Sequence, residues 1–276
     1  MKRVLTALVL IPIVLVIVFL GPKQHWLFSA AVAGVAVLAG WEYLGLTRQH
    51  GAKPPRIAVI VALLTLFFAN FEWPDRTPDV FGLLTLALLI LCTFRKPVEQ
   101  VMADASACIF CMFYIGFTLL TLINLHEQPN GPSLVVFLLC VVWAGDSLAL
   151  YIGRAWGKHR LAPGISPGKS WEGSIASVIG SLIAAGILLE LASQLQARDI
   201  AVLSYPDEPW YWLMLAVIVN IAAQVGDLAE SALKRSAGVK DSGSLLPGHG
   251  GMLDRIDALL LAAPVLWYAQ AVLHRF

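Results

Sequence analysis

The chain alternates between long apolar runs and short polar segments along its whole length. A helix needs roughly 20 mostly apolar residues to cross the hydrocarbon core of a bilayer, which is about 30 Å thick. Nine runs approach this length, and we expect each of them to form a transmembrane helix. They cover Val4–Leu20, Trp26–Leu46, Ile57–Phe71, Val80–Phe94, Ala105–Leu125, Leu134–Ile152, Gly173–Gln196, Trp210–Ala232 and Ile256–Leu273. The third and fourth runs are short, so a re-entrant pair is an alternative, although backbone hydrogen bonding in lipid favours complete helices.

The composition supports a membrane protein. Hydrophobic residues make up 58% of the 276 positions and charged residues only 13%, whereas soluble domains carry about 25% charged residues. Lys2 and Arg3 precede the first run as they would in a signal peptide, but no small-residue cleavage site follows it at Leu20–Pro22. We therefore predict an all-α polytopic membrane protein with about nine transmembrane helices, the first of them retained.

The loop charges predict the orientation, because Lys and Arg accumulate on the cytoplasmic side of a membrane. With a cytoplasmic N-terminus and an outer C-terminus, the outer side keeps only four of the 19 Lys and Arg residues: Lys23, Arg76, Arg198 and Arg275. We therefore expect a chain that crosses the membrane several times in this orientation.

The four cysteines all lie in apolar runs. Cys108 and Cys111 form a C-x-x-C pair, but neither a histidine nor a second cysteine pair lies nearby to complete a zinc site. Helix packing is the better interpretation.

No linker divides the chain, so we expect a single transmembrane domain. Polar residues cluster in two cytoplasmic loops, Gly153–Glu172 and Leu233–Arg255. We therefore predict that residues 1–132 form a helical scaffold and that residues 133–276 carry the catalytic helices and loops. The active site is expected at the cytoplasmic face of the C-terminal helices.

Four carboxylates lie near the inner ends of three predicted C-terminal helices: Asp146, Asp227, Asp254 and Asp257. Ionisable groups inside membrane helices are costly and indicate function by default. Residues three apart share a helix face, as Asp254 and Asp257 do. A carboxylate from each of two helices can hold Mg²⁺ while water and phosphate oxygens complete its coordination. For any single aspartate, a salt bridge to Arg235 or Arg255, or a helix cap, is the alternative.

The two polar loops also contain cations. The later loop has Lys234, Arg235, Lys240 and Arg255, and the earlier loop has Lys169. Arginine recognises phosphate through two hydrogen bonds and lysine acts as a mobile point charge. The alternative is that they set the topology and contact anionic lipid heads.

The later loop also contains Pro247–Gly251, with His249 as its one large side chain. The backbone N–H groups of Gly250 and Gly251 could approach phosphates closely. His249 either donates a hydrogen bond to a phosphate or supports the loop. None of the common nucleotide-binding or zinc-protease motifs is present.

The earlier loop contains Ser166, Lys169 and Ser170 just before a predicted helix. A helix N-terminus carries partial positive charge and attracts anions, so these residues are candidate substrate ligands. For a lone serine, capping of the helix is the better interpretation.

The segment Ser231–Asp257, which we call the signature block, resembles the signature of the phosphatidate cytidylyltransferases, also called CDP-diacylglycerol synthases. It reads SALKRSAGVKDSGSLLPGHGGMLDRID. The chain length, the number of runs and the S-P-x-K-S-x-E-G loop that ends at Gly173 also resemble the bacterial enzymes. Gly168 is a departure, because family members often carry a second lysine there.

The resemblance implies that CTP and phosphatidate react to give CDP-diacylglycerol and pyrophosphate. It implies Mg²⁺ as cofactor, with K⁺ as a candidate second cation, and Asp227 and Asp254 as metal ligands; Asp257 joins them by its spacing. Lys169 and the loop from Lys234 to the catalytic Lys240 would serve the phosphates. The resemblance likewise implies a homodimer in the inner (plasma) membrane of the cell, among membrane lipids, and we expect no nucleic-acid partner.

Two other functions stay open. A lipid-linked kinase that uses CTP would transfer the γ-phosphoryl group and release CDP instead of pyrophosphate. A transporter would carry its charges near the bilayer midplane, on paired broken helices in two halves of the chain. The clustering of charge at one face of one half favours cytidylyl transfer.

Overall fold

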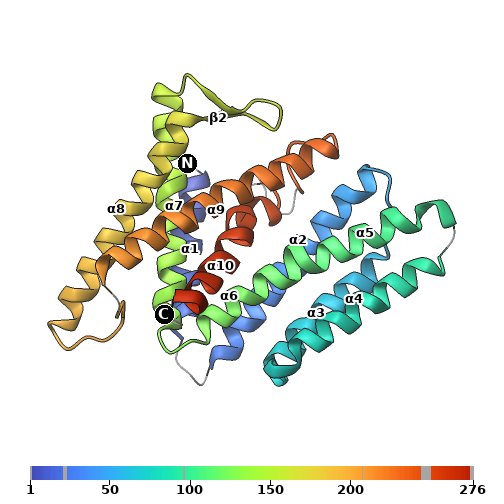
Figure 1. Cartoon of the computed structure of the whole chain (residues 1–276), viewed down its shortest axis with the longest axis horizontal. Coiled ribbons are helices and arrows are strands. Elements are labelled where there is room, and N and C mark those ends of the chain that lie inside the picture. Colours follow the sequence, from blue (N-terminus) through green and yellow to red (C-terminus); the bar gives the residue numbers. More distant parts are fainter. Residues whose placement is uncertain (1, 21–23, 96, 207, 244–249, 274–276) are drawn as a thin grey trace. The chain divides into compact units, whose positions relative to one another are not determined.

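The computed structural model describes residues 2–20, 24–95, 97–206, 208–243 and 250–273, and each predicted apolar run coincides with a helix (Figure 1). The helices are α1 (Lys2–Phe19), α2 (His25–Gln49), α3 (Arg56–Glu72), α4 (Thr77–Thr93), α5 (Val101–Cys111), α6 (Thr118–His126), α7 (Gly131–Trp156), α8 (Trp171–Gln196), α9 (Pro209–Ser236) and α10 (Leu253–Leu273). A π-helical stretch, Met112–Phe117, joins α5 to α6, so the fifth run forms one long helix.

Seven helices in the described part of the chain are long and apolar enough to cross a membrane. They are Trp26–Gln49, Pro74–Thr93, Val98–His126, Gly131–Trp156, Trp171–Gln196, Pro209–Ser236 and Leu253–Val272. The chain is therefore an all-α polytopic membrane protein, as predicted. The helices α1 and α3 are not among the seven, and α3 has 17 residues, so the count of nine spans stays a prediction.

The earlier of the two polar loops, residues 153–172, contains a short hairpin instead of irregular structure throughout. Strand β1 (Arg160–Ala162) pairs antiparallel with β2 (Ser166–Ser170), with Arg160 opposite Ser170 and Ala162 opposite Ser166. The strands have three and five residues and lack the apolar alternation that predicts a strand. Their pairing supplies partners for backbone groups just before α8 begins.

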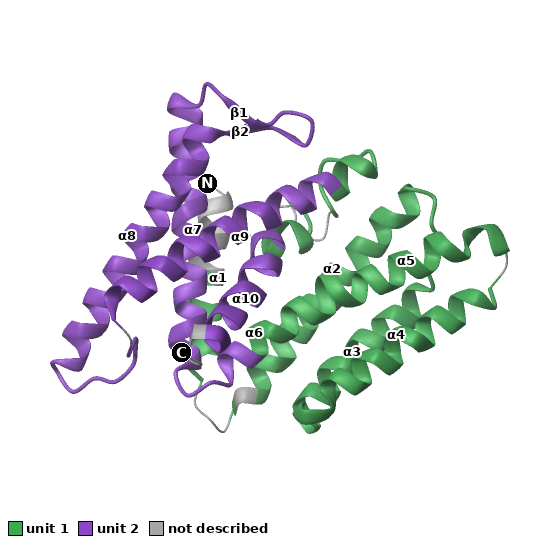
Figure 2. Ribbon diagram, viewed as in Figure 1, with its two compact units in different colours: residues 1–123, 233–256 green, residues 124–232, 257–276 purple. Residues whose placement is uncertain are grey.

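The described residues fall into two compact units (Figure 2). Unit 1 comprises residues 1–123 and 233–256, and unit 2 comprises residues 124–232 and 257–276. The last turn of α9 and the first turn of α10 therefore belong to unit 1, together with the described part of the signature block between them. The predicted division of the chain at residue 132 stays a prediction.

Unit 1 packs its helices through large aliphatic and aromatic side chains. Leu63 and Leu66 of α3 and Ile115 of the π-helical stretch are fully buried. At Gly40 on α2, an added Cβ would lie 2.8 Å from Leu63 Cδ1, so glycine lets α2 and α3 approach closely. Cys108 is fully buried, as is Cys111, which fits the packing interpretation of the C-x-x-C pair.

Unit 2 contains a buried polar network between its membrane helices. Asn220 on α9 donates to Ser177 Oγ at 2.9 Å and to Ser181 Oγ at 2.7 Å, both on α8. Ser181 donates in turn to the Val141 carbonyl of α7 at 2.8 Å, and Gln224 donates to Asn220 Oδ1 at 2.7 Å. Such hydrogen bonds join helices in lipid, where no water can replace them.

One face of α8 is apolar and exposed. Ile175, Ile179, Ile183, Ile187 and Leu191 follow one another at intervals of four residues, and each is at least 43% exposed. Residues four apart lie on the same side of a helix. This ridge is the surface expected to face lipid.

Close helix approach in unit 2 predicts a stability difference between two glycines of α8. An added Cβ at Gly180 would lie 2.8 Å from the Ala144 carbonyl oxygen of α7, whereas Gly186 has nothing within 4 Å. We expect Gly180→Ala to lower the stability by about 1–3 kcal/mol through overpacking. The matched control Gly186→Ala should leave it unchanged or slightly raised, because alanine favours helix. Thermal unfolding in detergent measures both, and equal midpoints would contradict the packing described here.

Candidate functional site

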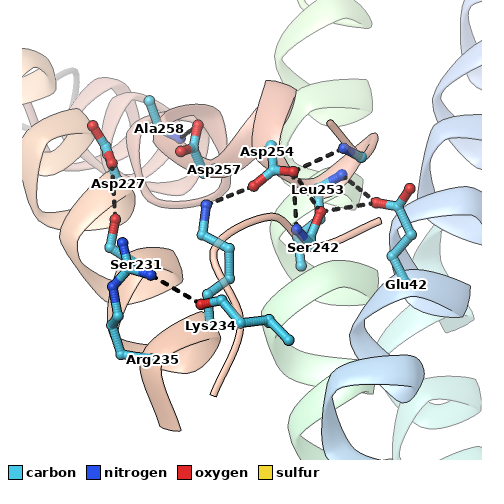
Figure 3. Close-up of polar contacts among 12 residues, drawn as sticks. Glu42, Asp227, Ser231, Lys234, Arg235, Ser242, Leu253, Asp254, Asp257 and Ala258 are labelled. Carbon is cyan, nitrogen blue, oxygen red and sulfur yellow. Dashed lines mark hydrogen bonds and ion pairs between the residues drawn. The ribbon is translucent and has the colours of Figure 1, made fainter. Parts of the chain in front are cut away.

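Asp254 organises the part of the signature block that lies in unit 1. Lys234 Nζ at the end of α9 lies 2.5 Å from Asp254 Oδ1, and the side chains are only 12% and 10% exposed (Figure 3). Asp254 Oδ2 accepts hydrogen bonds from Ser242 N at 3.0 Å, Ser242 Oγ at 2.9 Å and Gly251 N at 2.8 Å. One carboxylate thus joins the end of α9, the loop and the start of α10.

The position of Asp254 also explains the glycine at residue 250. Gly250 has a backbone φ of +78°, a conformation that residues other than glycine rarely adopt. A Cβ there would lie 2.7 Å from Asp254 Oδ2. Asp254 is the second residue of α10, where a negative charge is favourable next to the helix N-terminus.

Asp227 forms a second pair with lysine, within unit 2. Lys169 Nζ on β2 lies 2.6 Å from Asp227 Oδ2 on α9, and the side chains are 25% and 35% exposed. Asp146 on α7 interacts electrostatically with both members of this pair. Three predicted site residues from three elements are therefore neighbours.

Lys169 lies on β2, directly before α8, so the contacts that fix the start of α8 also position Lys169. Ser170 caps this helix by accepting a hydrogen bond from Gly173 N at 3.2 Å, which confirms the capping interpretation of Ser170. His159 Nδ1 and Glu172 Oε1 lie 2.7 Å apart, and Trp171 N donates to the His159 carbonyl at 2.9 Å. Ser166 lies at the other end of β2, opposite Ala162.

Asp227 also lies where α9 and α10 cross closely within unit 2. An added Cβ at the preceding Gly226 would lie 2.6 Å from the carbonyl oxygen of Asp257. Asp257 Oδ1 accepts a hydrogen bond from the backbone of Ala258 at 2.8 Å. Residues 227 and 257 thus flank one helix crossing.

The remaining predicted cations are exposed. They are Arg235, whose Nη1 donates to the Val239 carbonyl at 3.0 Å, Lys240 and Arg255. All three belong to unit 1, as the Lys234–Asp254 pair does. His249 lies outside the described residues.

The donor chemistry of the two aspartates fits a hard divalent cation. Asp227 Oδ1 receives a long hydrogen bond from Ser231 Oγ, at 3.4 Å, and so keeps capacity for a cation. Asp254 Oδ1 pairs with Lys234, so a cation there has to share or replace the lysine. No group of three or more His, Cys, Asp or Glu side chains suited to a metal occurs in the described part of the chain. Mg²⁺ is usually bound by one or two carboxylates, with waters and substrate phosphates as its other ligands. These aspartates can supply the carboxylates.

Sequence reasoning missed Glu42 and Ser242. Glu42 Oε2 on α2 accepts a hydrogen bond from Ser242 Oγ at 3.1 Å and from Leu253 N at 2.9 Å (Figure 3). The available signal was the position of Glu42, an acid inside the apolar run Trp26–Leu46, because such residues indicate function. Nothing in the sequence shows that it contacts a residue 200 positions away.

The chain is similar to known proteins over nearly its whole length. The model of the cytidylyltransferase family matches residues 1–273. The phosphatidate cytidylyltransferase of Brucella abortus (strain 2308) is 37% identical over an alignment of 276 positions, which covers 98% of this chain and 93% of the relative. Those of Haemophilus influenzae and Pseudomonas aeruginosa are each 34% identical, over 97% of both chains.

The Lys234–Asp254 pair, whose side chains are only 12% and 10% exposed, predicts a measurable effect on stability. Lys234→Met leaves the Asp254 charge without its cation, and we expect a loss of about 3 kcal/mol or more, the scale for breaking a buried pair. The double variant Lys234→Met with Asp254→Asn should recover part of this loss, because no unpaired charge remains. Thermal unfolding in detergent measures these effects, with Lys158→Met, an exposed lysine, as control. A Lys234→Met variant as stable as the control would refute the role of the pair.

Proposed function

This chain belongs to the cytidylyltransferase family, and on that premise we propose that it transfers the cytidylyl group of CTP to phosphatidate. The products would be CDP-diacylglycerol and pyrophosphate, and the pathway would be phospholipid synthesis. The observation that carries the proposal is the near full-length similarity to phosphatidate cytidylyltransferases. The signature block adds support, because it concentrates cations and carboxylates at helix ends.

The reaction needs little covalent chemistry from the protein. Phosphatidate ends in an anionic phosphate oxygen, which would attack the α-phosphorus of CTP in line with the departing pyrophosphate. No serine or cysteine intermediate is required. The protein has to hold two polyanions together and stabilise the charge that develops on the leaving group, which is positioning and electrostatics.

The two lysine–carboxylate pairs suit this task. Lys169 and Lys234 are each paired with an aspartate. A lysine is a mobile point charge, so each can move from its carboxylate to a substrate phosphate. Arg235 and Lys240 are exposed and would bind further phosphate oxygens, with Lys240 in a catalytic role.

Mg²⁺ is the cofactor that the carboxylates favour, and Asp227 with Asp254 and Asp257 would hold it. Bound there, the ion would supply Lewis-acid stabilisation of the phosphate charge. A departing lysine leaves its aspartate free for a cation, so lysine transfer to phosphate and metal binding would support each other. K⁺ is our proposal for a second cation.

The chain crosses the membrane several times, and we place it in the inner membrane with the N-terminus in the cytoplasm and the C-terminus outside. Phosphatidate would then reach the site within the inner leaflet while CTP arrives from the cytosol. We further propose a homodimer, as the family resemblance implies.

An assay of both products tests the proposed reaction. Purified protein incubated with CTP and phosphatidate in detergent micelles should release pyrophosphate and form a liponucleotide in equal amounts. Both should require Mg²⁺ and disappear when EDTA removes it. Release of CDP with a phosphorylated lipid would instead show a kinase, and turnover that persists in EDTA would contradict the Mg²⁺ proposal.

Two isosteric substitutions test the metal ligands. Asp227→Asn and Asp254→Asn remove the charge while they keep the shape, and we expect each to lower turnover about 100-fold or more, the scale for losing one electrostatic group at an active site. Asp199→Asn is the matched control, because Asp199 is exposed and its φ of 58° suits asparagine. Turnover is compared at equal amounts of folded protein. Activity like that of the control in either variant would exclude that aspartate as a metal ligand.

A further inference from the structure

Glu42 is a buried acid that contacts the signature block from a distant part of the sequence. It lies on α2, its side chain is 6% exposed, and its carboxylate accepts from Ser242 Oγ and Leu253 N. Leu253 is the first residue of α10, and its N–H has no acceptor within the helix. Glu42 therefore supplies an acceptor for the start of the helix that carries Asp254.

The same carboxylate determines where the loop needs glycine. An added Cβ at Gly243 would lie 2.6 Å from Glu42 Oε1, and one at Gly251 would overlap Glu42 Oε2 and Ser242 Oγ. A side chain at either position would displace the acid or the loop. The glycine at 251 is therefore required by contact with Glu42, in addition to any approach of a phosphate.

Ser242 connects Glu42 to Asp254. Its hydroxyl oxygen lies 3.1 Å from Glu42 Oε2 and 2.9 Å from Asp254 Oδ2, and its backbone N–H also donates to Asp254. A serine hydroxyl has one proton, so it donates to one carboxylate at a time. When the hydroxyl donates to Glu42, the backbone N–H of Ser242 still donates to Asp254, so this serine couples the position of α2 to the carboxylate proposed as a metal ligand.

Two other roles for Glu42 predict different behaviour. A residue that only fills the core would affect folding without affecting the loop or turnover of the folded protein. A cation ligand would need the negative charge, and Glu42 Oε1 has no hydrogen-bond partner among the described residues. Glutamine separates these roles, because its amide oxygen accepts the same hydrogen bonds without the charge.

We propose that Glu42 is a positioning residue for cytidylyl transfer: by accepting from Ser242 and Leu253 it holds Ser242 and the start of α10 so that Asp254 faces the reacting phosphates. The inference rests on the proposed function for its catalytic consequence. The structural link from Glu42 to the loop is independent of it.

Three variants test the proposal by two measurements. Glu42→Ala removes the acceptor, Glu42→Gln keeps it, and Glu72→Ala changes an exposed acid on α3 as control. The first measurement is hydrogen–deuterium exchange in the amides of residues 250–257, in detergent and without substrate or metal. We expect Glu42→Ala to speed exchange there about tenfold, whereas Glu42→Gln and the control behave as wild type.

The second measurement is turnover with CTP, phosphatidate and Mg²⁺ at equal amounts of folded protein. We expect Glu42→Ala to lower kcat at least tenfold and to raise the Mg²⁺ concentration for half-maximal activity, while Glu42→Gln stays within about threefold of wild type. Unchanged exchange in Glu42→Ala would overturn the proposal, as would normal kcat despite faster exchange. A Glu42→Gln variant as inactive as Glu42→Ala would overturn it in favour of a charge-dependent role.

Ser242→Ala keeps the test decisive if Glu42→Ala does not fold. It removes the hydroxyl between the two carboxylates and leaves the backbone N–H, and we expect kcat to fall several-fold with a higher Mg²⁺ requirement. Wild-type kinetics in Ser242→Ala would overturn the coupling.

If the wild-type chain showed no cytidylyl transfer, the proposed function would fail, whereas the exchange measurement would still decide the link between Glu42 and the loop.

Discussion

The carboxylate of Asp254 holds together the described residues of the signature block. A lysine ammonium group, two backbone N–H groups and a serine hydroxyl, which it shares with Glu42, all lie within hydrogen-bond distance of it. A charge at the start of a membrane helix is costly unless it is paired and hydrogen-bonded. The surrounding residues satisfy this requirement, and in doing so they fix the ends of two helices and the described parts of the loop between them.

The two lysine–aspartate pairs indicate how charged side chains are accommodated in a membrane protein. Each pair is neutral as a whole, so neither lysine nor aspartate stands alone. Phosphate oxygens attract the lysines, and a divalent cation attracts the aspartates. In the proposed reaction, substrate and metal therefore replace internal partners instead of entering a region of uncompensated charge, which lowers the electrostatic cost of binding.

The fold was predictable because the bilayer imposes a length on each helix. Every predicted run coincides with a helix, and Ser170 caps α8 as expected for a serine before a helix. The hairpin was not predictable, since strands of three and five residues carry too little pattern. Lys169 and Asp227, distant in sequence, were assigned to one site from their charges, and the structure pairs them.

The role of Glu42 was beyond sequence reasoning for a different reason. Its contacts with Ser242 and Leu253 join positions 200 and 211 residues apart, and only the folded chain brings them together. Gly251 was assigned to phosphate binding, and the structure adds a second requirement for glycine there, the Glu42 carboxylate. The metal ligands Asp227, Asp254 and Asp257 stay predictions, because their assignment depends on a bound cation.

The fate of individual CTP phosphorus atoms tests the central claim most directly. Purified protein is given phosphatidate with CTP labelled either at the α-phosphorus or at the γ-phosphorus, and the lipid is extracted and counted. Cytidylyl transfer predicts that the α label enters the lipid and that the γ label leaves entirely as pyrophosphate. A γ label in the lipid, or no label in the lipid from either CTP, would contradict the account.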